Sequence, residues 1–133
     1  MSYVPDNLKY TASHEWLEKL ANGNYRIGIT DHAQSQLGDI VFVELPEVDS
    51  SYGQEDECGV VESVKTASDI YCPAVGTVVA ANDALEDTPE LINDSPYDDG
   101  WIFELEIDDE TDLESLMSAE DYRASIEDED DSD

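Results

Sequence analysis

Short runs of alternating apolar and polar residues, separated by turn residues, extend along the chain to about Ala81. Trp16 to Leu20 and Tyr25 to Ile29 flank Asn22-Gly23, a dipeptide that tolerates the positive φ angles of a tight hairpin turn. Ile40 to Leu45 is rich in β-branched and aromatic residues, and Pro46 follows it. These patterns predict a first hairpin and a later strand in a chain made mainly of β structure.

One short helix is predicted between these strands. Thr30 or Asp31 can cap a helix over Ala33 to Leu37, because a side-chain oxygen at that position accepts a free backbone N–H group. Gly38 can end this helix in the left-handed conformation. Beyond it, the segment from Thr77 to Ala81 is typical of another strand.

The pattern changes after residue 84. Leu85 to Tyr97 contains two prolines and is predicted to be an irregular loop. Trp101 to Ile107 then alternates, with Phe103, Leu105 and Ile107 on one face, which is typical of a half-buried strand.

A helical period begins at Asp112, with Leu113, Leu116 and Met117 on one face. Ser118 with Asp121 resembles a capping box for a last helix that holds Tyr122 and Ile126. The length of 133 residues suits one domain, so we predict a domain over residues 1–126 and a disordered acidic tail over residues 127–133.

The chain has 35 acidic residues against 5 Lys and Arg, a formal net charge of −30. Only six acids lie in the terminal run, so the charge is spread over the surface and should repel itself at low ionic strength. We therefore expect a salt-loving protein from a salt-rich cytoplasm. The charge disfavours binding to nucleic acid. No apolar run of about 18 residues and no signal-like N-terminus occur, so a soluble, cytoplasmic protein is expected.

Lys65 is one of only three lysines and lies in the middle of Glu62 to Asp69. Val60-Val61 precedes this segment, and Ile70-Tyr71 follows it, which predicts a strand, a tight turn and a second strand with the lysine at the tip. An amine in that place can hold a covalently attached cofactor. The alternative is an unmodified, solvated turn lysine.

The other candidate groups point to structural roles. Cys58 and Cys72 are each seven residues from Lys65, so a disulfide is conceivable, although a cytoplasmic chain favours two reduced, partly buried thiols. His14 and His32 each adjoin a carboxylate in sequence, but neighbours on a strand point to opposite faces, so structural or capping roles are expected. The spacings match no metal site, and no catalytic motif appears.

Five blocks of sequence, in order from about Leu8 to Tyr122, resemble the glycine cleavage system H proteins, a family of lipoyl carriers. The blocks are Lys9 to Trp16, Gly28 to Gln34, Leu37 to Pro46, Glu62 to Lys65, and Ser95 to Tyr97 with Gly100-Trp101. The unusually acidic composition departs from an average member, which affects the electrostatics of partner binding rather than the fold.

The resemblance implies a flattened, lipoyl-domain-like barrel of two small antiparallel sheets, a barrel-sandwich hybrid, with short helices and a C-terminal helix. It implies that Lys65 carries lipoate through an amide bond and that the flanking residues form the segment by which the lysine is recognised. These are Glu62, Ser63, Val64, Thr66, Ala67, Ser68 and Asp69.

By the same resemblance the chain is a carrier and not an enzyme. It would receive an aminomethyl group from a pyridoxal-phosphate glycine decarboxylase and deliver it to a tetrahydrofolate-dependent aminomethyltransferase. A dihydrolipoyl dehydrogenase with FAD and NAD would then reoxidise the dithiol, and a lipoate ligase or lipoyl synthase would attach the group. Docking should be weak and short-lived, and the chain is expected to be monomeric.

The family shelters the loaded arm against the carrier, and Ser13, Glu15 and Asp69 are the residues here that suit a protonated amine. Biotin carriers share the hairpin lysine but usually place methionines beside it, where this chain has Val64 and Thr66. A lipoyl domain of a 2-oxoacid dehydrogenase, a carrier in a lipoate relay and an unmodified acidic binding module are the remaining alternatives.

Overall fold

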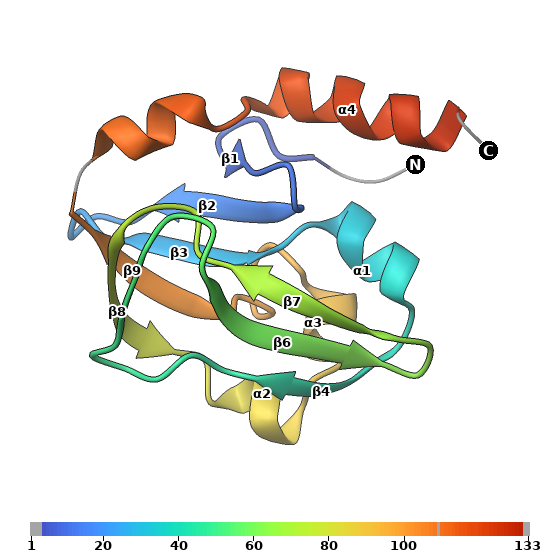
Figure 1. Ribbon diagram of the computed structural model, residues 1–133. Helices are drawn as coiled ribbons and strands as arrows, with labels where there is room; N and C mark the ends of the chain where they lie inside the picture. Colours follow the sequence, from blue (N-terminus) through green and yellow to red (C-terminus); the bar gives the residue numbers. More distant parts are fainter. Residues whose placement is uncertain (1–3, 109, 132–133) are drawn as a thin grey trace.

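Two antiparallel sheets face each other across the main core (Figure 1) in the computed structural model, which describes residues 4–108 and 110–131. The larger sheet has the order β1 (Lys9–Tyr10), β2 (Glu15–Lys19), β3 (Tyr25–Ile29), β9 (Phe103–Ile107), β8 (Gly76–Ala81) and β5 (Ser51–Tyr52). The smaller has the order β4 (Ile40–Glu44), β6 (Glu57–Ser63) and β7 (Ala67–Tyr71). The predicted mainly β fold of two antiparallel sheets is confirmed, and the sheets do not close into a continuous barrel.

The first hairpin is confirmed. Strands β2 and β3 pair from Glu15 opposite Ile29 to Lys19 opposite Tyr25. Gly23 has φ +90°, the conformation that the sequence predicts for this turn. Gly28 lies opposite Trp16, and a Cβ atom at residue 28 would come within 2.8 Å of the indole ring. This position of β3 therefore has room only for glycine.

The predicted short helix is α1 (Asp31–Leu37). The Thr30 hydroxyl accepts the Ala33 N–H at 3.2 Å, and Gly38 ends the helix with φ +86°. Both ends therefore follow from local chemistry, as predicted.

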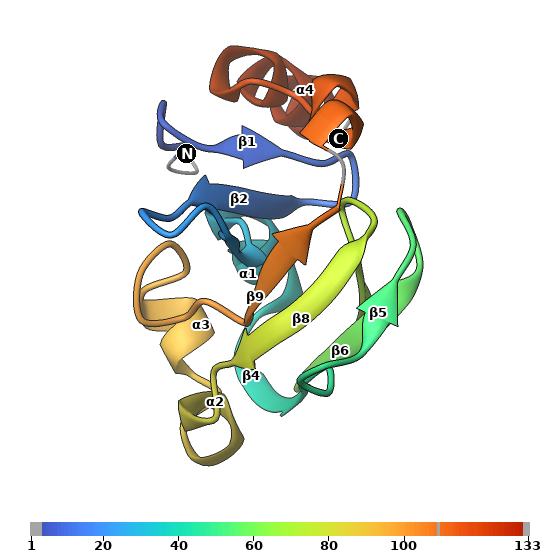
Figure 2. The ribbon, with the colours of Figure 1, turned by 90° about the vertical axis from the view of Figure 1, so that its left-hand side faces the viewer.

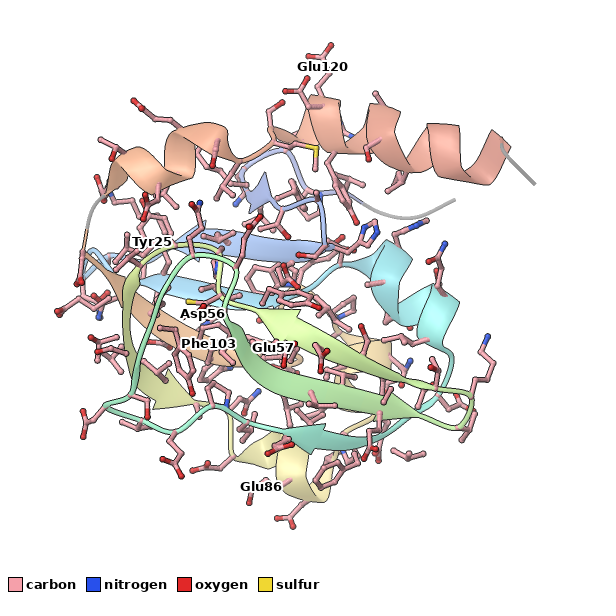
Figure 3. The ribbon with its side chains drawn as sticks, viewed as in Figure 1. Tyr25, Asp56, Glu57, Glu86, Phe103 and Glu120 are labelled. Carbon is pink, nitrogen blue, oxygen red and sulfur yellow. The ribbon has the colours of Figure 1, made fainter. Side chains whose placement is uncertain are left out.

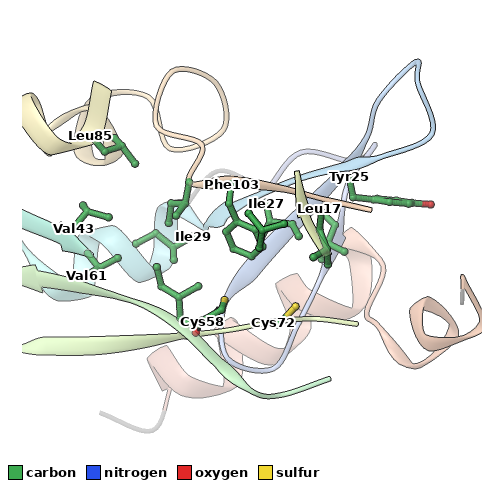
Figure 4. Close-up of a cluster of buried hydrophobic side chains, with 14 of the residues drawn as sticks. Leu17, Tyr25, Ile27, Ile29, Val43, Cys58, Val61, Cys72, Leu85 and Phe103 are labelled. Carbon is green, nitrogen blue, oxygen red and sulfur yellow. Dashed lines mark hydrogen bonds between the residues drawn. The ribbon is translucent and has the colours of Figure 1, made fainter. Parts of the chain in front are cut away.

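Apolar side chains from both sheets fill the space between them (Figure 4). The predicted inward face of β9 is confirmed, because Phe103 and Leu105 are fully buried and Ile107 is half-buried. The larger sheet also contributes Leu17 and Ile27, and the smaller sheet Val43, Val61 and Ile70. Acidic side chains such as Glu86 and Glu120 point away from this core (Figure 3), and Glu57 is exposed as well.

The prediction of an irregular loop over residues 85–97 is wrong, because two one-turn helices lie there, α2 (Ala84–Asp87) and α3 (Leu91–Asp94). Each turn is anchored by one fully buried side chain, Leu85 in α2 and Ile92 in α3. Pro89 lies between them, just before α3. Proline suits this place because it has no backbone N–H group that would need a hydrogen-bond partner at the start of a helix. Burial of a single residue per turn stabilises helices too short to show a sequence period.

The C-terminal helices lie along the β1 edge of the larger sheet (Figure 2). They are a 3₁₀ helix, η1 (Glu110–Ser115), and α4 (Ala119–Asp131). The Ser118 hydroxyl accepts the Asp121 N–H at 3.2 Å, as the predicted cap requires. Beneath α4 lies a second apolar cluster: Val4, Leu8, Tyr10, Trp16, Ala119, Tyr122 and Ile126.

Helix α4 continues five residues beyond the predicted end of the domain at residue 126. The domain boundary at residue 126 and the disordered acidic tail stay predictions, and residues 132 and 133 lie outside the described part of the chain. No glycine or proline follows Ser118, so no residue interrupts the backbone hydrogen bonding of the helix. Among the described residues, no helix is long and apolar enough to cross a membrane.

Candidate functional site

Lys65 is at the tip of the hairpin between β6 and β7, and its side chain is exposed. The Ser63 N–H donates to the Thr66 carbonyl oxygen at 2.7 Å, while the Ser63 hydroxyl accepts the N–H groups of Lys65 and Thr66 at 3.1 Å each. The predicted strand-turn-strand is confirmed. Ser63 therefore fixes the conformation of the turn that presents the lysine.

The corner between α1 and β4 supports this turn. The Val64 N–H donates to the Asp39 carbonyl oxygen at 3.1 Å. A Cβ atom at Gly38 would lie 3.2 Å from Lys65 Cε and 3.9 Å from its Nζ, so the lysine side chain passes close over the Gly38 backbone. A larger residue at Gly38 would have to displace the lysine and adopt an unfavourable positive φ.

Asn93 of α3 holds this corner together. Its side-chain NH₂ group donates to Gln34 Oε1 and to the Gly38 carbonyl oxygen, and its Oδ1 accepts the Ile40 N–H, each at 2.9 Å. Sequence reasoning missed this residue. Nothing local marks it, since an asparagine between two prolines is also typical of a turn.

Lys65 makes no ion pair with any residue that the structure describes. Lys19 and Arg26, by contrast, pair with Glu110 and Glu104, and Arg123 pairs with Asp6. An exposed amine without a carboxylate partner is available to another molecule.

A cavity of about 250 Å³ lies beside the turn, between α1, the loop before β2 and the β6–β7 hairpin. Its lining residues are Ser13, His14, Glu15, Ile29, Ala33, Gln36, Leu37, Val61, Thr66, Ser68, Asp69 and Ile70. The candidates Ser13, Glu15 and Asp69 thus line one cavity. Thr66 also lines it, so the cavity extends to the residue next to Lys65.

Glu15 is buried, with 1% of its surface exposed. Its Oε1 accepts the hydroxyls of Thr11 and Ser13 at 2.6 Å each, and its Oε2 accepts the Tyr71 N–H at 3.4 Å. Burial raises the pKa of the Glu15 carboxyl group, and these hydrogen bonds oppose the rise. Thr11 was not predicted, although it also accepts the Glu15 N–H and so closes the loop.

Asp69 is at the edge of this site rather than inside it. Because side chains alternate along a strand and Ile70 is buried, Asp69 points to the opposite face of β7. It also lines a shallow groove on that face with Glu44 and Val60. Among the described contacts, Asp69 makes no hydrogen bond with Ser13 or Glu15.

The two histidines lie together near the N-terminus of α1. The Tyr122 hydroxyl is 2.7 Å from His14 Nδ1 and 2.7 Å from the Thr30 hydroxyl, and the two imidazole rings are 5.1 Å apart. This network joins α4 to the cavity loop and to α1, which suits the structural role predicted for His14 and His32. No group of three or more potential metal ligands occurs among the described residues.

Cys58 and Cys72 are both buried thiols. A bulge between Glu57 and Gly59 displaces Cys58 from the regular register of the hairpin. The Cys58 thiol donates to the Ile70 carbonyl oxygen at 3.5 Å and the Cys72 thiol to that of Ala74 at 3.1 Å. The neighbouring Cys72 and burial both raise the pKa of Cys58, so this thiol stays protonated.

Known proteins are similar to this chain in both sequence and fold. The family model for the glycine cleavage H-protein matches residues 8–129. Glycine cleavage system H proteins of Salmonella arizonae and Escherichia coli (strain K12 / DH10B) are each 57% identical over 129 residues, covering 97% of this chain and all of theirs. The crystal structure of a glycine cleavage system H protein from Mycobacterium marinum superposes with a TM-score of 0.84 at 38% identity, covering 92% of this chain and 98% of that one. The chain therefore belongs to the glycine cleavage H-protein family, whose members are lipoyl carrier subunits and not themselves catalysts.

Proposed function

We propose that Lys65 carries lipoate through an amide bond at Nζ and that the chain serves the glycine cleavage system. The observation that carries this proposal is an exposed lysine without an ion pair among the described residues, on a turn fixed by Ser63, beside a cavity. Amide formation replaces the lysine ammonium by a neutral amide, so the net charge of the chain becomes more negative by one. The bound group would supply a dithiolane able to hold an aminomethyl group on one sulfur.

The chain's own residues would present, recognise and shelter that group. The hairpin extends the lysine into solvent, where a partner's active site can receive it while the carrier body stays outside. The enzyme that attaches the group would recognise the lysine by the flanking segment from Glu62 to Asp69. In the cavity, Ser13 and Glu15 would attract the protonated amine of the loaded group, with Asp69 at the rim.

The partners that this role requires are those implied by the family. They are a pyridoxal-phosphate glycine decarboxylase, a tetrahydrofolate-dependent aminomethyltransferase, a dihydrolipoyl dehydrogenase with FAD and NAD, and a lipoate ligase or lipoyl synthase. A monomeric carrier in a salt-rich cytoplasm fits this role, since the net charge of −30 keeps copies apart and the encounters must be brief.

Intact mass after incubation with lipoate, ATP and a lipoate–protein ligase tests the attachment. The wild type should gain one lipoyl group, Lys65→Arg none, and the control Lys9→Arg one. A wild-type chain that stays bare, or a Lys65→Arg chain that is still modified, would refute the proposal.

The sheltering role of Glu15 has a separate test. Loaded Glu15→Gln should lose its aminomethyl group faster than loaded wild type, because the carboxylate that attracts the amine is gone, while lipoylation remains. Release of formaldehyde and ammonia over time measures the lifetime. An unchanged lifetime would remove Glu15 from the sheltering site and leave the carrier role intact.

A further inference from the structure

Three exposed apolar side chains lie near the Lys65 turn. Val64 is 68% exposed, Val41 is 53% exposed and Phe42 is 51% exposed. Among the described residues, only two other large apolar side chains are exposed, Val48 and Val75, and they lie in separate loops. A group of exposed apolar residues marks a contact surface more strongly than isolated ones do.

Strand pairing brings these three residues to neighbouring positions at one end of the smaller sheet. The Val64 N–H donates to the carbonyl oxygen of Asp39, the residue before β4, and Phe42 lies opposite Glu62 of β6. A shift of register between Ile40 and Phe42 turns both Val41 and Phe42 outward. At about 3.3 Å per residue, the pair Phe42–Glu62 lies roughly 10 Å along the hairpin from Lys65. We call Val41, Phe42 and Val64 the apolar patch.

Acidic residues adjoin the apolar patch. Glu62 is the cross-strand neighbour of Phe42, and Glu44 is two positions further along β4, on the same face. Although β4 is an edge strand, its Ile40 N–H is already bonded to Asn93, which hinders addition of a partner's strand there. A partner would therefore bind the side chains, with apolar residues over the patch and Lys or Arg opposite Glu44 and Glu62.

We propose that the apolar patch is the docking surface for the enzyme that acylates Lys65, whose complementary surface is an apolar hollow rimmed by basic residues. This inference rests on the proposed carrier function. An acylating enzyme meets a bare lysine, so it must obtain its binding energy from the protein around the turn, whereas enzymes that act later can also bind the attached group. Val64 of the patch is the residue next to Lys65 in the sequence, so an enzyme that reaches the amine can dehydrate the patch in the same encounter.

Steady-state lipoylation tests the proposal, with a purified bacterial lipoate–protein ligase, ATP, lipoate and varied carrier concentration. Phe42→Ser and Val64→Ser should each raise the KM for the carrier about tenfold with little change in kcat, since docking is lost and chemistry is not. Val48→Ser removes a valine that is 50% exposed, in another loop, and should match the wild type. Thermal unfolding of each variant shows whether it is folded.

Charge reversal tests the basic rim. Glu44→Lys should also raise KM, while Glu120→Lys on α4, across the molecule from β4 (Figure 3), should not. If folded Phe42→Ser and Val64→Ser keep the KM of Val48→Ser, the docking surface is overturned, and modification of the wild type at Lys65 leaves the carrier function standing. A wild type that is not modified overturns both.

Discussion

At the scale of single residues, Glu15 combines burial with hydrogen bonding. Burial raises the pKa of this carboxyl group above its ordinary 4.5. Between 4.5 and the raised value the folded state holds a proton that the unfolded state has lost, so the contribution of Glu15 to stability falls as pH rises through this window. The free energy of unfolding of wild type minus that of Glu15→Gln should therefore decrease with pH above 4.5 and become level once the folded group is ionised.

Urea unfolding in 2 M KCl, at a series of pH values, measures this difference, and the salt limits the influence of the other carboxylates. Glu106→Gln, an exposed residue of β9, controls for the removal of one surface charge and should show a smaller dependence on pH. A Glu15 difference that is flat or rises with pH would show that the hydrogen bonds from Thr11, Ser13 and Tyr71 outweigh the cost of burial.

At the scale of elements, local chemistry predicted some segments and not others. Helix α1 was predictable because Thr30 and Gly38 mark its two ends, and the first hairpin because Asn22-Gly23 specifies its turn. Helices α2 and α3 were missed because each depends on burying one residue against distant parts of the chain. Asn93 was missed for the same reason, since its hydrogen-bond partners are 53 to 59 residues away.

Asn93→Ala should reduce the free energy of unfolding by about 1–3 kcal/mol, because it leaves the Ile40 N–H and the Gly38 carbonyl group without their partner. Asp94→Ala is the matched control on the same helix, exposed and with no described side-chain bond, and should change stability by less than about 0.5 kcal/mol. Urea denaturation measures both. Equal effects of the two substitutions would mean that the corner beneath Lys65 does not depend on this amide.

At the scale of the whole molecule, charge repulsion opposes the compact state. A net charge of −30 on 133 residues leaves most carboxylates without a cation. Raising KCl from about 50 mM to about 2 M shortens the screening length to a few ångströms and should raise the midpoint of thermal unfolding, by about 4 °C for each kcal/mol of repulsion removed.

Circular dichroism during heating measures the midpoint. Replacing three exposed acids by glutamine, at Glu47, Glu106 and Glu114, lowers the charge and should reduce the gain from salt. Equal midpoints at both salt concentrations would contradict the expectation of a salt-loving protein and leave the fold and the candidate site unaffected.

The sequence by itself determined what depends on neighbours along the chain: the turn at Asn22-Gly23, both ends of α1, the inward face of β9 and the hairpin that carries Lys65. These follow from backbone dihedral preferences, capping and the period of apolar residues, which act over a few positions. Only the tertiary structure decided what packs beneath and beside that lysine: Asn93 under the α1–β4 corner, Glu15 with the Tyr71 N–H, and Tyr122 between His14 and Thr30. Such contacts form only when distant segments meet. Folding buries these polar groups, and each then needs a hydrogen-bond partner that the packing of other segments supplies.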